Sequence, residues 1–310
     1  PLSPGQALSI GLLRYAGFAG LLDQAPWLAL HLDASREEWA VAARVGLRAL
    51  GSGCADVLLR ELAYGRRSAR HTLLELVREL HVGRDLILSL YERELEAVRA
   101  DLLRAGALGD REPFAILRQR LAERVEEALH SALALLAALH DEDRIAELGD
   151  LLRFAHGGRR YAILLEALES LLDPRERARL VPLLEEGALD ARARIAAAAV
   201  GRPVPKLEAA LDELRADPED LLRSLALAVA GRRDVGDHDW VKPALVALQL
   251  RSLPFFQGLS PRQLVALGRV VREEEHGPGA CISREGTFDD CLYLLVDGVV
   301  TVTREGTFLA

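Results

Sequence analysis

Histidines and acidic side chains are the groups in this sequence that could bind a metal ion or transfer protons. His71 and His81 are ten residues apart, and so are His130 and His140. A zinc site needs three or four ligands, and neither pair has a third ligand close by in the sequence. We therefore predict no metal site at these pairs and expect each histidine at a surface or boundary position.

Two short segments combine groups that could act on a proton or a phosphate. "HDEDR" at 140–144 offers carboxylates, and "HGGRR" at 156–160 offers a glycine turn followed by two guanidinium groups. The N–H groups of such a turn can form an anion-binding nest. Both segments lie where two helices should join, so we interpret them as helix caps and as an interhelical turn. The motifs HExxH, GxSxG, GxxxxGK and GxGxxG do not occur, and no enzyme is predicted.

The three cysteines, Cys54, Cys281 and Cys291, form no CxxC pair and have no paired histidines nearby. This spacing favours buried thiols in a reducing, cytoplasmic compartment over a metal site or a disulfide. Asp289 and Asp290 are interpreted as turn residues. No metal site and no catalytic residue is therefore predicted anywhere in the chain.

Composition indicates the elements that must position these groups. Half of the 310 residues are hydrophobic, only 5% are aromatic, and alanine and leucine, both strong helix formers, dominate. The formal net charge of −8 argues against a general nucleic-acid-binding surface. No run of 18 apolar residues occurs, so no segment in the sequence is expected to span a membrane.

Residues 1–232 show the pattern of successive amphipathic helices. Five apolar residues between positions 125 and 139 are spaced by three or four and should share one helix face: Val125, Leu129, Leu133, Leu136 and Leu139. Asp173-Pro174 and Asp217-Pro218 each predict an Asp N-cap followed by proline at the first helical position, and Ser35 has capping-box spacing.

Glycine-containing breaks are expected to separate these helices near Gly51, Gly65, Gly83, Gly106, Gly157, Gly187, Gly201 and Gly231. Helices of about 12 to 25 residues joined by short breaks favour a mainly α fold built as a HEAT-like α-solenoid. An irregular helical bundle is the alternative. Residues 233–250 are predicted to be a linker and a connecting helix, because the stretch around 231–239 is glycine-rich and charged.

Residues 251–310 change in character. Ser260, Pro261 and Gln263 predict a capped helix, and the Phe255-Phe256 pair should pack under it. Beyond that helix the apolar period becomes two, which predicts strands over 292–296 and 300–303 that are joined by a turn at Asp297-Gly298.

These last 60 residues resemble the N-terminal half of a cyclic-nucleotide-binding domain. The family pattern is Phe-x-x-Leu-Ser, a helix, G-x-x-I-x-x-x-G, an acidic turn, L-Y-x-(I/L)-x-x-G and a valine-rich strand. The matching positions are Phe256, Leu259, Ser260, Gly279, Ile282, Gly286, Asp289, Leu292, Tyr293, Leu295 and Gly298. The three glycines should provide turns with positive φ, which only glycine adopts at low cost.

The resemblance implies a truncated β-roll and, as its ligand, cAMP or cGMP. The family holds the ribose and cyclic phosphate in a later cassette, which this sequence does not contain, so those residues have no counterpart here. The positions left to line a pocket wall are Ser283, Val300 and Val302. The alternative is that these three residues are simply core of the roll.

The helical part, chiefly residues 140–185, is similar to the soluble tail of bacterial proteins that resemble ATP:ADP antiporters. That resemblance implies a membrane domain upstream of residue 1. Methionine is absent, including at position 1, which fits a chain cut from a longer protein.

We therefore expect a non-enzymatic regulatory protein, without a cofactor, in which the β-roll senses a cyclic nucleotide and the helices contact a protein partner or attached domain. A scaffold that binds no nucleotide, or the soluble tail of a membrane nucleotide transporter, is the alternative.

Overall fold

The computed structural model describes residues 4–32, 37–64, 69–155, 158–185, 187–230, 239–287, 291–304 and 307–308. Helices make up 74% of the structure and strands 1%, which confirms the mainly α prediction. The chain divides into two compact units, Pro1–Arg269 and Val270–Ala310. Within the described ranges, no helix is long and apolar enough to cross a membrane.

The first unit contains every helix of the described chain. The α-helices are α1 Pro4–Phe18, α2 Ala25–Leu30, α3 Glu37–Leu50, α4 Ala55–Tyr64, α5 Arg70–Glu79, α6 Arg84–Leu108, α7 Ala115–His140, α8 Asp143–Phe154, α9 Gly158–Leu171, α10 Pro174–Leu184, α11 Leu189–Val200, α12 Leu207–Arg215, α13 Asp220–Ala230, α15 Lys242–Ser252 and α16 Pro261–Gly268. Short 3-10 turns are η1 Leu22–Gln24, η2 Gly51–Cys54, η4 Glu112–Phe114, η5 Asp239–Val241 and η6 Pro254–Phe256.

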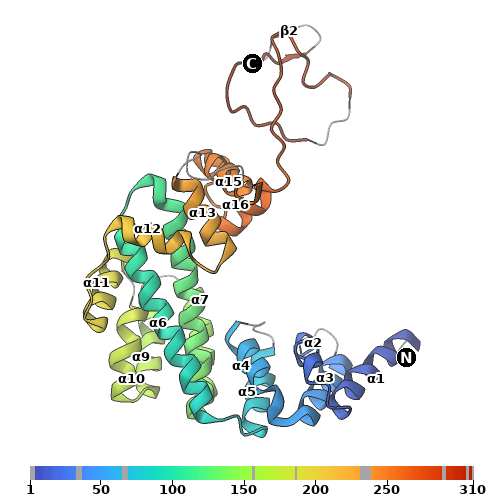
Figure 1. Cartoon of the computed structure of the whole chain (residues 1–310), viewed down its shortest axis with the longest axis vertical. Helices are drawn as coiled ribbons and strands as arrows, with labels where there is room; N and C mark the ends of the chain where they lie inside the picture. Colours follow the sequence, from blue (N-terminus) through green and yellow to red (C-terminus); the bar gives the residue numbers. More distant parts are fainter. Residues whose placement is uncertain are drawn as a thin grey trace. The chain divides into compact units, whose positions relative to one another are not determined.

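The two longest helices, α6 and α7, lie side by side and form what we call the central helix pair (Figure 1). The five residues predicted to share one face of α7 are all buried. From Ser131 to Leu139 every residue of α7 is buried, because α4, α5 and α8 cover the faces that α6 leaves open. A helix that is apolar all round is buried on all sides.

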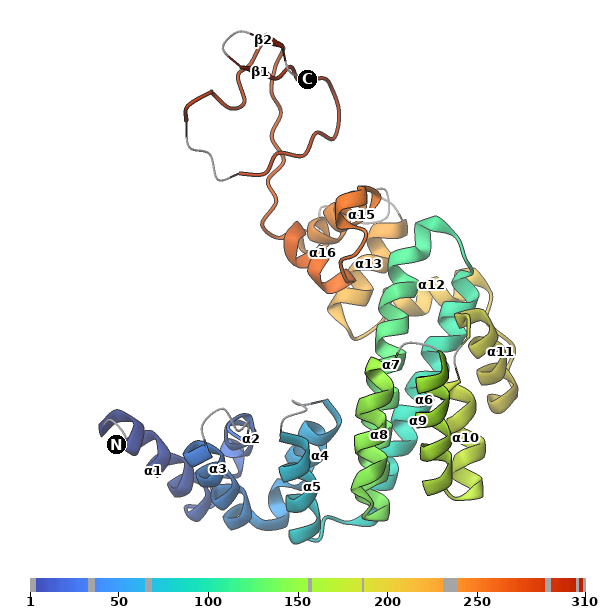
Figure 2. The ribbon, with the colours of Figure 1, turned by 180° about the vertical axis from the view of Figure 1, so that it is seen from behind.

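The remaining helices pack around this pair. α1 to α3 pack on one another and reach α7 through α4 and α5, whereas α8 follows α7 and α9 follows α8. Figure 2 shows α8, α9 and α10 beside the part of the pair that ends at His140, with α12 and α13 near the opposite end. Two apolar cores result, one around the His140 end of α7 and one around its Ala115 end.

Nearest-neighbour stacking of the kind found in helical repeats therefore occurs along α7–α8–α9 and α12–α13–α15–α16. Contacts of α11 with α6, and of α13 with α7, join helices far apart in the sequence, as in a bundle.

Two helix boundaries lie about two residues from the predicted positions, since α6 ends at Leu108 and α13 begins at Asp220. Gly106 does not break a helix but lies inside α6, where an added Cβ would lie 2.6 Å from the Cβ of Ala193 in α11. The helix after Asp217-Pro218 begins at Asp220, two residues beyond Pro218, although the Asp217 carboxylate accepts from the N–H of Glu219 as an N-cap does. The same carboxylate also pairs with Arg104 and Arg124. The Asp217 side chain thus serves tertiary contacts beyond the cap.

The helix ends predicted at Asp173 and Ser260 are confirmed. The Asp173 carboxylate accepts from the N–H of Glu176, and Pro174 is the first helical residue. Ser260 and Gln263 form a reciprocal capping box. Of the phenylalanine pair only Phe256 is buried, at 6% exposed, whereas Phe255 is 82% exposed.

The segment from Leu253 to Gly268 packs with the helical unit, since α16 contacts α15 and α7. The unit boundary therefore falls after Arg269, later than the predicted start at 251. The predicted linker around 231–239 lies, up to residue 238, outside the described residues, as do Ser35, Asp289 and Asp290.

The second unit contains one short antiparallel hairpin, β1 Thr303–Arg304 paired with β2 Thr307–Phe308, with Thr303 opposite Phe308. The strand predicted over 292–296 is not formed, and of the strand predicted over 300–303 only Thr303 is in a strand, as the first residue of β1. Strands need neighbouring strands and a covered apolar face, and these residues are exposed. The turns are as predicted: Gly279, Gly286 and Gly298 have φ of +78°, +80° and +97°.

The crossing of α1 and α3 depends on two glycines. A Cβ on Gly17 would lie 2.2 Å from the carbonyl oxygen of Gly46, whereas a Cβ on Gly11, on the same helix, would meet nothing within 4 Å. Backbone atoms cannot move aside as side chains do, so the two helices would have to separate.

We predict that Gly17→Ala lowers the free energy of unfolding by about 1–3 kcal/mol, the usual effect of overpacking. Gly11→Ala, the matched control, should raise it by about 0.5–1 kcal/mol through helix propensity alone. Urea unfolding followed by circular dichroism measures both changes. Equal effects of the two substitutions would contradict the close crossing.

Candidate functional site

The predicted pocket-wall residues lie in the second unit and are exposed. Val300 is 42% exposed and Val302 is 48% exposed, and Ser283 also faces solvent. Neighbouring Val299 is 94% exposed. Val300 and Val302, which were predicted to face the interior of the roll, are thus less exposed than Val299, which was not. Cys281 and Cys291 are exposed, contrary to the expectation of buried thiols, whereas Cys54 is buried.

The densest group of charges lies in the helical unit, where α6, α7 and the turn before α13 meet. Arg120 of α7 is only 2% exposed, and its guanidinium donates to carboxylates of Glu219, Glu123 and Glu127 at 3.0–3.3 Å. Arg262 of α16 approaches the Glu127 carboxylate at 3.5 Å. The arrangement encloses one guanidinium in three carboxylates that come from two separate elements.

One turn further along α7, Arg124 joins two buried carboxylates. Its guanidinium lies 2.9 Å from Asp101 of α6 and 2.9 Å from Asp217. Arg104 of α6 approaches the same two carboxylates at 3.2 and 3.3 Å. We call Asp101, Arg104, Arg120, Arg124, Asp217 and Glu219 the buried charge network.

Burial and attraction oppose each other in this network. The pKa of Asp101 is raised to about 6: burial is the main cause, Arg124 and Arg104 oppose it, and the charge of Asp217 adds to it. The pKa of Arg120 is raised because hydrogen bonds and charges of Glu127 and Glu219 outweigh its own burial. The network therefore joins α6 and α7 to the turn before α13.

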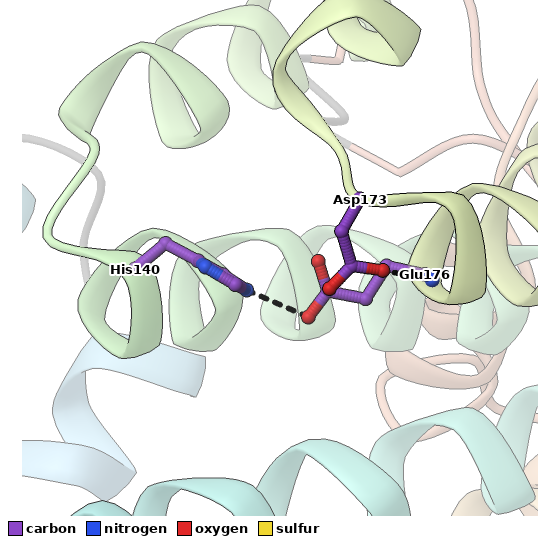
Figure 3. Close-up of side chains that lie close together, drawn as sticks. All are labelled: His140, Asp173 and Glu176. Carbon is purple, nitrogen blue, oxygen red and sulfur yellow. Dashed lines mark hydrogen bonds and ion pairs between the residues drawn. The ribbon is translucent and has the colours of Figure 1, made fainter.

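A second group of chemically capable side chains lies at the other end of α7. The ligand atoms of His140, Asp173 and Glu176 all lie within 4.8 Å of one another. His140 Nε2 is 2.6 Å from Glu176 Oε1. Figure 3 shows the Glu176 carboxylate between the imidazole of His140 and the carboxylate of Asp173.

Helix ends position these three residues. His140 is the last residue of α7, which ends because Asp141 adopts the left-handed conformation. Asp173 is the N-cap of α10, and Glu176 occupies the third helical position. In a capping box the third residue would reach back to the cap, but the Glu176 side chain reaches His140 instead.

Glu176 is 8% exposed, and its Oε2 is buried without a hydrogen-bond partner among the described residues. The hydroxyl of Tyr91 in α6 is likewise buried and makes no hydrogen bond there. Burial raises the pKa of Tyr91, and the negative charge of Glu176 raises it further. The phenol thus stays protonated.

Sequence patterns missed both groups. His140 is exposed, as the sequence predicts, but its acidic neighbours come from positions 173 and 176 at the start of another helix, which no sequence pattern indicated. His130, predicted at a surface or boundary position, has intermediate burial, with a side chain 10% exposed that lies 3.2 Å from Asp150. The "HDEDR" acids do cap and pair: Glu142 caps α8, and Asp141 and Asp143 pair with Arg78.

Comparison of the chain with models of protein families, with curated proteins and with solved structures gives no match.

We predict that Arg120→Met lowers the free energy of unfolding by about 3–5 kcal/mol, because removing one partner leaves buried carboxylates uncompensated. The matched control is Arg215→Met, whose 3.0 Å pair with Asp212 is largely exposed and should contribute less than about 1 kcal/mol. Urea denaturation of both variants tests this. A loss for Arg120→Met no larger than for the control would count against a structural role of the network.

The pKa of Asp101 predicts a pH dependence. Its folded-state pKa, about 6, exceeds the ordinary value of 3.8, so the folded protein binds the proton more tightly than the unfolded chain does. Stability contributed by this group is full below pH 4 and is lost as pH rises to 6. The stability of wild type minus that of Asp101→Asn should therefore fall by up to about 3 kcal/mol between pH 4 and pH 6. Chemical denaturation at each pH measures the difference; a difference that rises with pH would show the opposite shift.

Proposed function

We propose that this chain is a non-enzymatic regulatory protein in which a segment of cyclic-nucleotide-binding type is joined to a helical, HEAT-like interaction unit. The observation that carries the proposal is the spacing of the family pattern between Phe256 and Gly298. Many fixed spacings within so short a stretch are improbable by chance.

Local structure at the matching positions supports the proposal. The pattern's three glycines adopt the positive φ that sharp turns require. Phe256 is buried, and Ser260 caps the helix that follows it. These features are those expected at the entry to a β-roll of this type.

The helical unit offers a surface for a protein partner. Leu12, Tyr15 and Phe18 of α1 are spaced by three residues and are 50%, 63% and 73% exposed. Large apolar side chains gathered on one exposed helix face are typical of interaction surfaces. This surface favours the proposed role of the helices as the part that passes a signal to another protein or attached domain.

The spacing of Cys54, Cys281 and Cys291, with no CxxC pair, favours a reducing compartment, and we propose a cytoplasmic location. The second candidate is a scaffold that binds no nucleotide, including the soluble tail of a membrane transporter. The exposure of Val300 and Val302 is the observation that favours it.

Calorimetric titration of cAMP and cGMP tests the proposal, with linear 5′-AMP as the control ligand. The protein titrated is the product of the native gene extended past Ala310, because residues 1–310 have no counterpart of the phosphate-binding cassette. We expect saturable binding of a cyclic nucleotide in the micromolar range, about −8 kcal/mol, and none of 5′-AMP. No binding by a protein that circular dichroism shows to be folded would favour the scaffold.

A matched pair of variants tests the pocket wall. Val302→Glu would place a negative charge against the cyclic phosphate and should weaken binding at least about ten-fold, roughly 1.4 kcal/mol. Val299→Glu adds the same charge at the neighbouring position that the alternation places outside, and should bind like wild type. Equal nucleotide affinity of the two variants would contradict the assignment of Val302 to the pocket wall.

A further inference from the structure

The geometry points to a site for a divalent transition-metal ion of the zinc class, formed by His140, Asp173 and Glu176. One imidazole nitrogen and two carboxylates are ligands that zinc accepts, whereas the imidazole disfavours calcium and magnesium. Three protein ligands leave a further position for water. This site is separate from the cyclic-nucleotide proposal and does not depend on it.

The first support is convergence. The three ligand atoms lie within 4.8 Å of one another although His140 ends one helix and the two acids begin another. Figure 3 shows all three side chains directed toward a common space. The spacing Asp-x-x-Glu brings both acids to one side of the first turn of α10, where the helix end also holds Asp173 in place.

The second support is independent of the clustering. Glu176 is 8% exposed as a whole residue and 11% exposed in its side chain, and its Oε2 has no hydrogen-bond partner among the described residues. A buried carboxylate oxygen without a partner is unfavourable, and native proteins rarely leave one so. An ion pair with His140 accounts for Oε1 but leaves Oε2 unexplained. A cation in the space between the three side chains would satisfy that oxygen.

Metal binding would alter the contact between His140 and Glu176. The Nε2 and Oε1 atoms, 2.6 Å apart, share a proton in a hydrogen bond. A bound cation takes the place of that proton: Nε2 presents its lone pair to the metal, and the proton moves to Nδ1 or to solvent. The ion would then join the end of α7 to the start of α10 and should stabilise the folded helical unit.

Isothermal titration of ZnCl₂ into the full chain, freed of metal by chelation, tests the site. We expect one saturable site per chain, a rise in melting temperature on zinc addition, and a visible absorption band with Co²⁺ in place of zinc. Glu176→Gln keeps an acceptor for His140 and the size of the side chain but removes the charged ligand. It should lower the zinc affinity at least about ten-fold and abolish the Co²⁺ band.

Asp173→Asn is the second variant, because asparagine caps helices about as well as aspartate and the helix should remain intact. It should also weaken zinc binding at least about ten-fold. The matched control is His71→Gln, an exposed histidine near Glu75 and Asp143, which approach different ring nitrogens. This control should bind zinc like wild type.

Three results would overturn the site: no saturable zinc binding by the folded wild type, wild-type affinity in both Glu176→Gln and Asp173→Asn, or loss of binding in His71→Gln alone. Circular dichroism and melting of the metal-free variants show whether they are folded. The chain has eight histidines, and binding to exposed imidazoles only would appear as weak zinc uptake that the two acidic substitutions leave unchanged.

Discussion

The packing of α6 against α7 is the interaction on which the helical unit depends. These helices have 25 and 26 residues, and the other helices pack on them directly or through one or two intervening helices. The contact is apolar: Leu95, Val98, Leu102, Val125 and Leu136 are each fully buried. Burial of apolar area, at about 25 cal/mol per Å², is the main favourable contribution to folding, and a long helix pair supplies it over its whole length. Shorter helices gain stability by covering the faces of this pair.

The packing of this pair also buries charged side chains, and removing them from water is unfavourable. Each buried charge is therefore paired with side chains of opposite charge. Arg120 and Arg124 project from α7 toward Asp217 and Glu219, which precede α13. A buried ion pair contributes little net stability, because desolvation offsets most of the attraction. Its geometric requirement is strict, however, so the network fixes where α13 docks. At the other end of α7, His140 and Glu176 define in a similar way where α10 begins.

The second unit follows a different constraint. Its turns are set by glycines whose backbone conformations other residues adopt only with strain, and these turns occur as the sequence predicts. Its strands are reduced to the hairpin of β1 and β2, since a strand is stable only with paired edges and a covered face. Val300 and Val302 carry the right residue type for a roll interior, but the described residues around them supply no cover. Local conformation and long-range pairing are thus separable in this segment.

The sequence by itself determined what depends on near neighbours: the helical class, the apolar face of α7, the caps at Asp173 and Ser260 and the turns at the three glycines. Each follows from side chains within about four residues. The tertiary structure alone decided that Gly106 packs against α11, that Asp217 pairs with arginines of the central helix pair, and that Glu176 meets His140. Such contacts join positions tens of residues apart. Which residues meet depends on which helices pack on the surface of α6 and α7, and a local sequence pattern does not contain that information.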